Sequence, residues 1–211
     1  MNSPIPPAPP PGALHAPHTM RNTGPILDVL GRVLSGCRAV LEIACGSGEQ
    51  APRFAAALAP EQWLSCDISP DAVASATAWA QATGQKNLLP PMVLDVSNPP
   101  WTLPAGFMPD AIICINMIHI APLAACRGLM TGAGALLPPG GRLYLYGPYK
   151  VDGTHTAPSN AAFDQSLRAR NPAWGIRDIE DVAAMAEACG LKLVETINMP
   201  ANNLSLVLEK T

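Results

Sequence analysis

A short apolar stretch that contains an acidic residue and ends in a glycine turn constrains this fold more than any other feature. It runs Arg38-Ala-Val-Leu-Glu-Ile-Ala-Cys-Gly-Ser-Gly48. The apolar run predicts a buried strand, and the glycines predict a tight turn because glycine adopts positive φ freely. Asp67 follows nineteen residues after Gly48, at the end of the next predicted strand. A glycine-containing first turn followed by such an acidic residue is typical of α/β sheets that hold a ribose.

The acidic residues indicate which nucleoside would fit. Glu42 and Asp67 are anionic, whereas the pyrophosphate of a dinucleotide prefers N–H groups and a helix N-terminus. S-adenosylmethionine carries a sulfonium, an ammonium and no phosphate, so carboxylates are compatible with it. The spacing from Glu42 to Gly48 also departs from the G-x-G-x-x-G pattern. The stretch therefore favours S-adenosylmethionine, and the alternative is an ordinary strand-to-helix turn whose glycines serve packing.

The composition predicts a globular chain without a nucleic-acid or membrane partner. Its 211 residues, 48% hydrophobic and 14% charged, suffice for the core of one α/β domain. A net charge of −3 and the lack of a basic run disfavour nucleic acid. No apolar run is long enough to span a bilayer, and residues 1–20 lack the charged and apolar regions of a secretory signal.

The cysteines and histidines predict reduced thiols and no metal site. The six cysteines form no C-x-x-C pair, and most stand in apolar runs where a free thiol behaves as a small hydrophobe. That usage is typical of a cytoplasmic protein. The four histidines show no metal-ligand spacing. The positions are Cys37, Cys45, Cys66, Cys114, Cys126, Cys189, His15, His18, His119 and His155.

A disordered, proline-rich tail is predicted over residues 1–20, before a single domain over 21–211. Seven prolines in the tail disfavour helix and favour a solvated extended chain, and a polyproline II ligand is the alternative. The first helix is predicted from Pro25, which suits a first helical turn. Strands are then predicted at 39–44, 62–66, 91–94, 110–116 and 142–146, and helices at 49–58, 70–83 and 122–136.

Residues 147–177 interrupt this alternation and are predicted to form an insertion that covers the site. A helix at 179–189 and strands at 191–197 and 203–209 complete the chain. The short link between the last two strands requires an antiparallel pair. The sequence therefore predicts an α/β fold, a Rossmann-like, doubly wound, seven-stranded sheet that is mostly parallel with an antiparallel C-terminal strand.

Several longer segments carry a resemblance to known proteins. They are Arg21-Asn22, Leu41-Glu-Ile-Ala44, Gly46-Ser-Gly48, Asn116-Met-Ile-His-Ile120, Tyr146-Gly-Pro-Tyr149, Phe163-Asp164, Trp174-Gly-Ile-Arg-Asp178 and Met199-Pro-Ala-Asn-Asn203. With these segments the chain resembles class I S-adenosylmethionine-dependent methyltransferases, and more closely the methyltransferase-like 26 family, over residues 21–211. Two departures stand out. Ala44 replaces a glycine that is usual in the wider superfamily, and Glu49-Gln50 replaces an expected Gln-His.

The resemblance implies a cofactor site at the carboxyl ends of the strands. It implies that Glu42 lies near the methionine ammonium and that Asp67 binds the ribose hydroxyls. Asp95 would accept from the adenine amino group, and Asn116 would flank the methionine portion. Each carboxylate has an alternative as a helix cap or a solvated loop charge. The predicted set is Glu42, Ala44, Gly46, Ser47, Gly48, Asp67, Ile68, Asp95, Val96, Asn116 and Met117.

Two residues are candidates for catalysis. Methyl transfer from a sulfonium is an in-line displacement, for which a protein mainly aligns and desolvates the reactants. A general base is needed only when the nucleophile arrives protonated. His119, after the fourth predicted strand, and Tyr146, at the end of the fifth, could serve as a base or orient the acceptor. Their alternatives are a structural histidine and a core aromatic.

Polar residues of the insertion and of the last hairpin are candidates for acceptor binding. Arg168 and Arg177 could grip an acidic acceptor, whereas an Asp164–Arg168 salt bridge is the alternative at four-residue spacing. Aromatic residues make up only 5% of the chain, which favours a small polar metabolite, with a carboxylate among its candidate groups. The predicted set is Arg21, Asn22, Tyr149, Asn160, Asp164, Arg168, Trp174, Arg177, Asn202 and Asn203.

The sequence therefore predicts a cytoplasmic S-adenosylmethionine-dependent methyltransferase that acts on a small molecule, without a metal ion, and it leaves the oligomeric state open. One rival hypothesis is a nicotinamide-dependent oxidoreductase on a similar sheet. The other is a protein that binds the cofactor or a partner without turnover, with the proline-rich tail as the partner site.

Overall fold

The structure, a computed structural model, describes residues 8–211. These residues form two compact units. The first unit runs to Asp95 and includes Leu103–Ile113, and the second comprises Val96–Thr102 and Cys114–Thr211. The first seven residues of the predicted tail lie outside the described residues.

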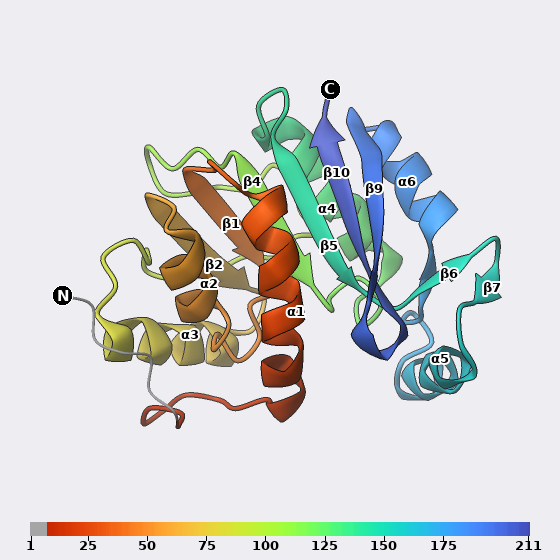
Figure 1. The fold of residues 1–211 in the computed structure, drawn as a ribbon, viewed down its shortest axis with the longest axis horizontal. Helices are drawn as coiled ribbons and strands as arrows, with labels where there is room; N and C mark the ends of the chain where they lie inside the picture. The colour runs from red at the N-terminus through yellow and green to blue at the C-terminus, as the bar shows by residue number, and fades with distance from the viewer. Residues whose placement is uncertain (1–7) are drawn as a thin grey trace. The chain divides into compact units, whose positions relative to one another are not determined.

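Alternating helices and parallel strands build the first unit. β1 (Ala39–Ile43) pairs in parallel with β2 (Gln62–Asp67), and β2 pairs in parallel with the short β3 (Met92–Val93). All five residues of β1 are buried, which explains why its sequence is a near-continuous apolar run. The helices of this unit, labelled in Figure 1, are α1 (Pro17–Val33), α2 (Ala51–Leu58) and α3 (Pro70–Thr83).

The start of α1 differs from the sequence prediction. The helix begins at Pro17, and Pro25 stands inside it rather than in its first turn. Arg21 and Asn22, which were predicted to precede the first helix, therefore lie within it. Pro17 suits a first helical position as well as Pro25 does. Polar contacts of residues 14–16, which the sequence does not reveal, hold the preceding segment in place, so the predicted disorder does not describe the end of the tail.

Antiparallel strands dominate the second unit. β10 (Asn203–Lys210) pairs antiparallel with β5 (Arg142–Gly147) and with β9 (Leu191–Met199). A single 3-10 turn, η1 (Pro200–Asn202), joins β9 to β10, and so short a link requires antiparallel pairing. The same unit contains the helices α4 (Leu123–Leu136) and α6 (Ile179–Glu187).

One seven-stranded sheet includes strands of both units. Its hydrogen-bonded order is β3-β2-β1-β4-β5-β10-β9. β4 (Ala111–Ile115) begins in the first unit and ends in the second, and four of its five residues are buried. The mostly parallel sheet with one antiparallel C-terminal strand confirms the predicted Rossmann-like fold class.

The interrupting segment folds as a small sheet with a helix. β6 (Tyr149–Val151) pairs antiparallel with β7 (Thr154–His155) and in parallel with β8 (Arg177–Asp178). Helix α5 (Pro158–Arg170) contacts β7, and Figure 1 shows the β6–β7 hairpin beside it. The sequence predicted the interruption and, through the shared helix face of Asp164 and Arg168, a helix within it. It did not predict the strands, because strands of two and three residues carry almost no periodic signal.

Asp164 of α5 ties this small sheet together. Its Oδ1 accepts a hydrogen bond of 2.7 Å from the Ile176 backbone N–H. Its Oδ2 lies 3.2 Å from Arg168 Nε, 3.4 Å from His155 Nε2 and 3.7 Å from Lys150 Nζ. Burial alone would raise the pKa of Asp164. The hydrogen bond from the Ile176 N–H and the charges of Arg168 and Lys150 outweigh this effect, so the pKa is lowered.

Candidate functional site

The glycine loop (residues 44–48) leads from β1 toward α2. Ala44, Gly46 and Gly48 have φ of 57°, 57° and 73°, the left-handed region that glycine adopts without strain. A Cβ on Gly46 would meet no atom within 4 Å, so this glycine borders open space. A Cβ on Gly48 would collide with the backbone of Ala76 in α3. Close packing against α3 therefore requires a glycine at position 48, whereas Gly46 is free to face a ligand.

Asp67, at the end of β2, binds the glycine loop directly. Its Oδ2 accepts a hydrogen bond of 2.9 Å from the Gly46 N–H, and its Oδ1 accepts one of 2.9 Å from the Ser69 N–H. The Ser69 hydroxyl in turn caps α3. Each carboxylate oxygen can accept a second hydrogen bond, so these contacts orient Asp67 without exhausting it.

Glu42 is a buried carboxylate within β1. Its side chain is held by Ser65 Oγ, which donates to Oε2 at 2.6 Å, and by Trp63 Nε1, which donates to the same atom at 3.2 Å. Burial raises the pKa of Glu42 to about 7, although both hydrogen bonds lower it. At neutral pH the protonated and ionised forms of a carboxyl group with this pKa have similar free energies. A positively charged ligand nearby would therefore shift Glu42 to its ionised form.

The other predicted cofactor residues differ in their surroundings. Ile68 follows β2 with 64% of its surface exposed, which is unusual for an isoleucine. The Ser47 hydroxyl donates to Glu49 Oε1 at 3.1 Å. Asp95 is half-buried and belongs to the first unit. Val96, the next residue, is buried and belongs to the second unit. The Val96 carbonyl accepts a hydrogen bond from Trp101 Nε1 at 3.2 Å.

In the second unit, the residues after β4 lie against the end of β5. The Asn116 N–H donates to the Tyr146 carbonyl at 2.8 Å, and Asn116 has φ of 59°. A Cβ on Gly147 would lie 3.0 Å from the His119 ring and 3.7 Å from Asn116 Oδ1, so these side chains are neighbours. The Tyr146 hydroxyl accepts from Asn203 Nδ2 at 3.1 Å. Four predicted residues of the second unit, two for catalysis and two for binding, are therefore close together.

His119 is held as a neutral imidazole. Only 3% of the residue is exposed, and burial, reinforced by the charge of Arg177, lowers its pKa to about 4. Its Nδ1 has no hydrogen-bond partner among residues 8–211. The Phe163 ring meets it edge-on, with ring centroids 5.8 Å apart. His119 is thus a poor general base at neutral pH but an available hydrogen-bond partner.

The two predicted anion-binding arginines are engaged elsewhere. Arg177 donates from Nε to the Ile118 carbonyl at 3.0 Å and from Nη2 to the carbonyls of Ala121 and Ala173 at 2.7 and 3.1 Å. Arg168 pairs with Asp164, which is the alternative that the four-residue spacing predicted. Both guanidinium groups already bind groups of the protein, which favours the structural alternative over the predicted grip on an acidic acceptor.

The predicted asparagines form a network between α5 and the last hairpin. Asn160 Nδ2 donates to the Asn202 carbonyl at 2.9 Å and to Thr156 Oγ1 at 3.0 Å. Asn202 Nδ2 donates to Ser159 Oγ at 3.1 Å, and Asn203 Nδ2 donates to the Pro200 carbonyl at 3.2 Å as well as to Tyr146. Asn160 and Asn202 therefore fasten α5 to η1, which is a structural task.

Two predicted acceptor residues lie apart from this network. Tyr149 is fully buried, and its hydroxyl has no partner in the described part of the chain, so burial holds its pKa well above the ordinary value. Trp174 is half-buried, with the Arg170 guanidinium 5.6 Å from its ring. Tyr149 is therefore a core residue, contrary to its prediction for acceptor binding.

Sequence reasoning missed Phe163 and Glu49 as site residues. Phe163 is 37% exposed and contacts His119, but only the position of α5 creates that contact. Glu49 is almost completely buried although it is charged. Its place directly after the glycine loop was the available signal, and the sequence alone does not show what surrounds its carboxylate.

One protein family matches nearly the whole chain. Residues 14–210 match the family described as "Protein of unknown function (DUF938)". The chain belongs to this family. The match begins at Leu14, within the segment that was predicted to be a tail, and it extends through β10.

Solved structures of methyltransferases share the fold. An O-methyltransferase family protein from Burkholderia thailandensis matches with a TM-score of 0.76 at 16% identity, over 92% of this chain and 57% of its own. Human N-acetylserotonin methyltransferase in complex with S-adenosylmethionine matches at 0.73 and 14%, over 90% and 51%. Magnesium protoporphyrin IX methyltransferase from Synechocystis, with bound S-adenosylhomocysteine, matches at 0.67 and 17%, over 92% and 84%. The chain thus spans little more than half of the first two proteins.

The described residues contain neither a membrane-spanning helix nor a cluster of metal ligands. Within residues 8–211 no helix combines the length and apolar character needed to cross a bilayer. The same part of the chain contains no group of three or more histidine, cysteine, aspartate or glutamate side chains arranged to bind a metal ion.

Proposed function

We propose that this chain is an S-adenosylmethionine-dependent methyltransferase whose first unit holds the cofactor. One observation carries the proposal: the Gly46 N–H is bonded to Asp67 where the loop borders open space. The carboxyl ends of neighbouring parallel strands are where α/β sheets bind nucleosides. The methyltransferases with the same fold, two of them solved with S-adenosylmethionine or S-adenosylhomocysteine, support this choice of ligand.

The residues of the first unit suit the parts of this cofactor. Asp67 has unused acceptor capacity for ribose hydroxyls. Glu42, with a pKa near neutrality, suits an ammonium group that would keep it ionised. The exposed Ile68 suits the face of an adenine ring. The cofactor supplies an activated methyl group, and these side chains bind and orient it. Ala44, Gly46, Ser47 and Asp95 complete the proposed set in this unit.

The acceptor is proposed to be a small polar molecule that hydrogen-bonds to the residues around His119. His119, Asn116, Tyr146 and Asn203 offer neutral donors and acceptors. Because the pKa of His119 is lowered to about 4, this histidine orients the acceptor rather than removing its proton. Burial also raises the pKa of Tyr146, which therefore acts as a neutral hydroxyl. The engaged arginines count against a carboxylate on the acceptor.

Several finer features belong to the same proposal. The resemblance to the methyltransferase-like 26 family, a cytoplasmic location and the absence of a nucleic-acid partner rest on the sequence. They are consistent with the fold and with the net charge of −3. The oxidoreductase and binding-protein hypotheses are outcomes that the experiments below distinguish.

Incubation of the full chain with methyl-labelled S-adenosylmethionine and a metabolite extract tests the activity. Mass spectrometry should find label in a small polar product, and Tyr146→Phe should lower the yield by about tenfold, as the loss of one hydrogen bond to the acceptor predicts. An Arg170→Ala variant, with its change on the exposed side of α5, is the control. Label confined to protein or nucleic acid contradicts the proposed acceptor class, and no label in any fraction contradicts the activity.

A further inference from the structure

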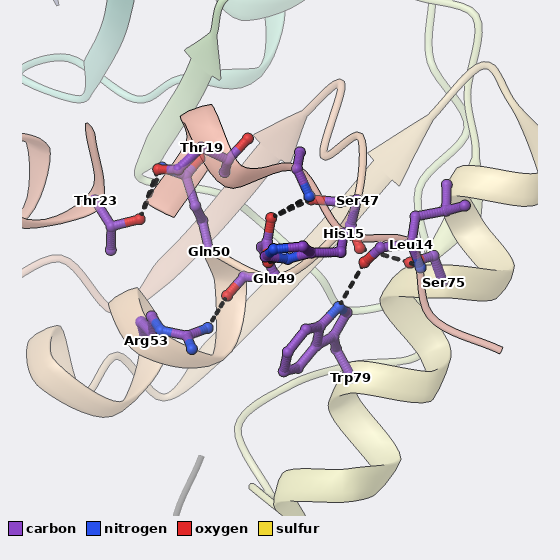
Figure 2. A network of polar contacts seen from close by, with 11 residues as sticks. Leu14, His15, Thr19, Thr23, Ser47, Glu49, Gln50, Arg53, Ser75 and Trp79 are labelled. Carbon is purple, nitrogen blue, oxygen red and sulfur yellow. Dashed lines mark hydrogen bonds and ion pairs between the residues drawn. The ribbon is translucent and has the colours of Figure 1, made fainter. Parts of the chain in front are cut away.

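Glu49 is a buried carboxylate that binds two different segments of the first unit. Its side chain is 1% exposed. Oε1 accepts hydrogen bonds from the Ala16 N–H at 2.9 Å and from Ser47 Oγ at 3.1 Å, and Oε2 lies 3.0 Å from His15 Nδ1. Figure 2 shows the N-terminal segment and the glycine loop meeting at this side chain.

A second set of contacts fastens the same two segments to α3. The Leu14 N–H donates to Ser75 Oγ at 2.7 Å, and the Ser75 hydroxyl donates to the Ser47 carbonyl at 2.6 Å. Trp79 Nε1 donates to the Leu14 carbonyl at 3.4 Å (Figure 2). Both the side chain and the carbonyl of Ser47 in the glycine loop are therefore bound within a network that includes residues 14–16.

The next residue extends the network into α1. Gln50 Nε2 lies 3.3 Å from the Thr19 carbonyl and 3.3 Å from Thr23 Oγ1, and it donates to both. Arg53 Nη1 donates to the Glu49 carbonyl at 2.6 Å, and its guanidinium lies 5.6 Å from the Trp79 ring. Contacts with α1 and with Trp79 of α3 thus hold the start of α2, and with it the end of the glycine loop.

Glu49 and the glycine loop both depend on these contacts. A buried carboxylate that loses its polar partners is strongly destabilised, and two of the three partners of Glu49 belong to residues 15 and 16. The glycine loop contains Gly46 and Gly48, and glycine backbones have access to many conformations. Contacts that select one of them lower the entropy that a ligand would otherwise have to remove.

We propose that Glu49 is a positioning residue that clasps residues 14–16 onto the glycine loop and so holds the loop ready for its ligand. The inference rests on the proposed function for the identity of that ligand. Residues 14–16, called the N-terminal clasp, thereby belong to the binding site although they precede the first helix. Removal of the Glu49 carboxylate releases the clasp and the loop together.

Hydrogen exchange of the full chain, without ligand, tests the clasp. Glu49→Ala should raise exchange by about tenfold or more in peptides that cover residues 14–23 and 44–50, because the Ala16 N–H loses its acceptor and the Ser47 hydroxyl no longer ties the glycine loop to it. Glu61→Ala, which removes an exposed carboxylate paired with Arg38, is the matched control. Val182→Ala, which leaves a cavity in the core of the second unit, controls for a general loss of stability. Unchanged exchange at residues 14–23 in Glu49→Ala overturns the clasp.

Calorimetry with S-adenosylhomocysteine then tests the positioning role. Glu49→Ala should weaken binding by at least about fivefold, and Glu49→Gln, which keeps an acceptor oxygen, should recover part of that loss. Both Glu61→Ala and Val182→Ala should bind as the parent does. Equal affinity in Glu49→Ala overturns the positioning role and leaves the proposed function intact. A parent chain that binds no S-adenosylhomocysteine overturns the proposed function, and the positioning role with it, whatever the exchange experiment gives.

Discussion

Glu42 shows how one buried side chain links stability to ligand binding. In the folded chain burial raises the pKa of Glu42 from 4.5 to about 7. The folded state therefore holds this proton more tightly than the unfolded state does. The stabilisation is fully present below about pH 4.5 and is lost as the pH rises through about 7. At neutral pH the folded chain is thus destabilised by the Glu42 charge, which a cationic ligand would compensate.

A Glu42→Gln variant should expose this linkage. Because glutamine resembles the protonated acid, it should match the parent near pH 4 and exceed it at pH 8 by up to about 3 kcal/mol in free energy of unfolding. Denaturant unfolding at both pH values measures the difference. Affinity of the parent for S-adenosylmethionine should rise by about thirtyfold from pH 5.5 to pH 8, and the variant should lose that dependence. A pH-independent stability difference contradicts the raised pKa.

Two glycines of the same loop should respond differently to alanine. Gly46→Ala places a Cβ in open space and should cost only the strain of the left-handed backbone, about 1 kcal/mol, while it reduces ligand affinity. Gly48→Ala forces the loop against α3 and should cost about 2–4 kcal/mol. Thermal unfolding and calorimetry separate the two effects. Equal losses of stability would contradict the assignment of Gly48 to packing.

The types of residue in the first unit could be predicted from the sequence, but their partners could not. Glu42 follows from a strand that precedes a glycine turn and Asp67 from the end of the next strand, since both positions lie where parallel strands end. That Gly48 serves α3, and that Arg177 binds backbone carbonyls, depends on contacts across many residues. A single sequence contains no signal for such contacts.

Among the elements of the second unit, the connection from β4 to α4 depends on Arg177 of β8. Its guanidinium binds the carbonyls of Ile118 and Ala121 on one side and of Ala173 on the other. His119 lies between the first two of these carbonyls along the chain. The arginine therefore fixes the backbone that carries His119, which is a structural task rather than the recognition of an acidic acceptor.

Arg177→Ala should accordingly lower stability rather than change the acceptor. The loss of charged donors to three carbonyls should cost about 2–3 kcal/mol in free energy of unfolding. Arg170→Ala, which removes an exposed arginine next to Trp174, should cost less than about 1 kcal/mol. Denaturant unfolding compares them. A stable Arg177→Ala protein whose only defect is a raised KM for an acidic acceptor would restore the original prediction.

Long elements were predictable and short ones were not. Strands β1, β2, β4 and β5 and helices α3 and α4 lie within a few residues of their predicted ranges, because apolar runs and turn residues mark them. The strands β6, β7 and β8 depend on pairing and on Asp164 instead. The start of α1 was missed because Pro17 and Pro25 both suit a first turn, and only the contacts of residues 14–16 decide between them.

At the scale of the whole molecule, the fold class follows from the order of elements. Alternating strands and helices predict a parallel sheet, and the three-residue link between the last strands predicts the reversed one. Function does not follow from the fold in the same way, because one fold hosts many reactions. The proposed function therefore depends on the site in the first unit, where Gly46, Asp67 and Glu42 lie at the carboxyl ends of β1 and β2.

Isothermal titration calorimetry of the full chain with S-adenosylhomocysteine at pH 8 tests that site most directly. We expect saturable binding that Asp67→Ala weakens by about ten- to a hundredfold, as the loss of charge-assisted hydrogen bonds requires. An Asp28→Ala variant, changed on the exposed surface of α1, should bind as the parent does. Binding of NADH in place of S-adenosylhomocysteine, or an Asp67→Ala variant with unchanged affinity, would contradict the account.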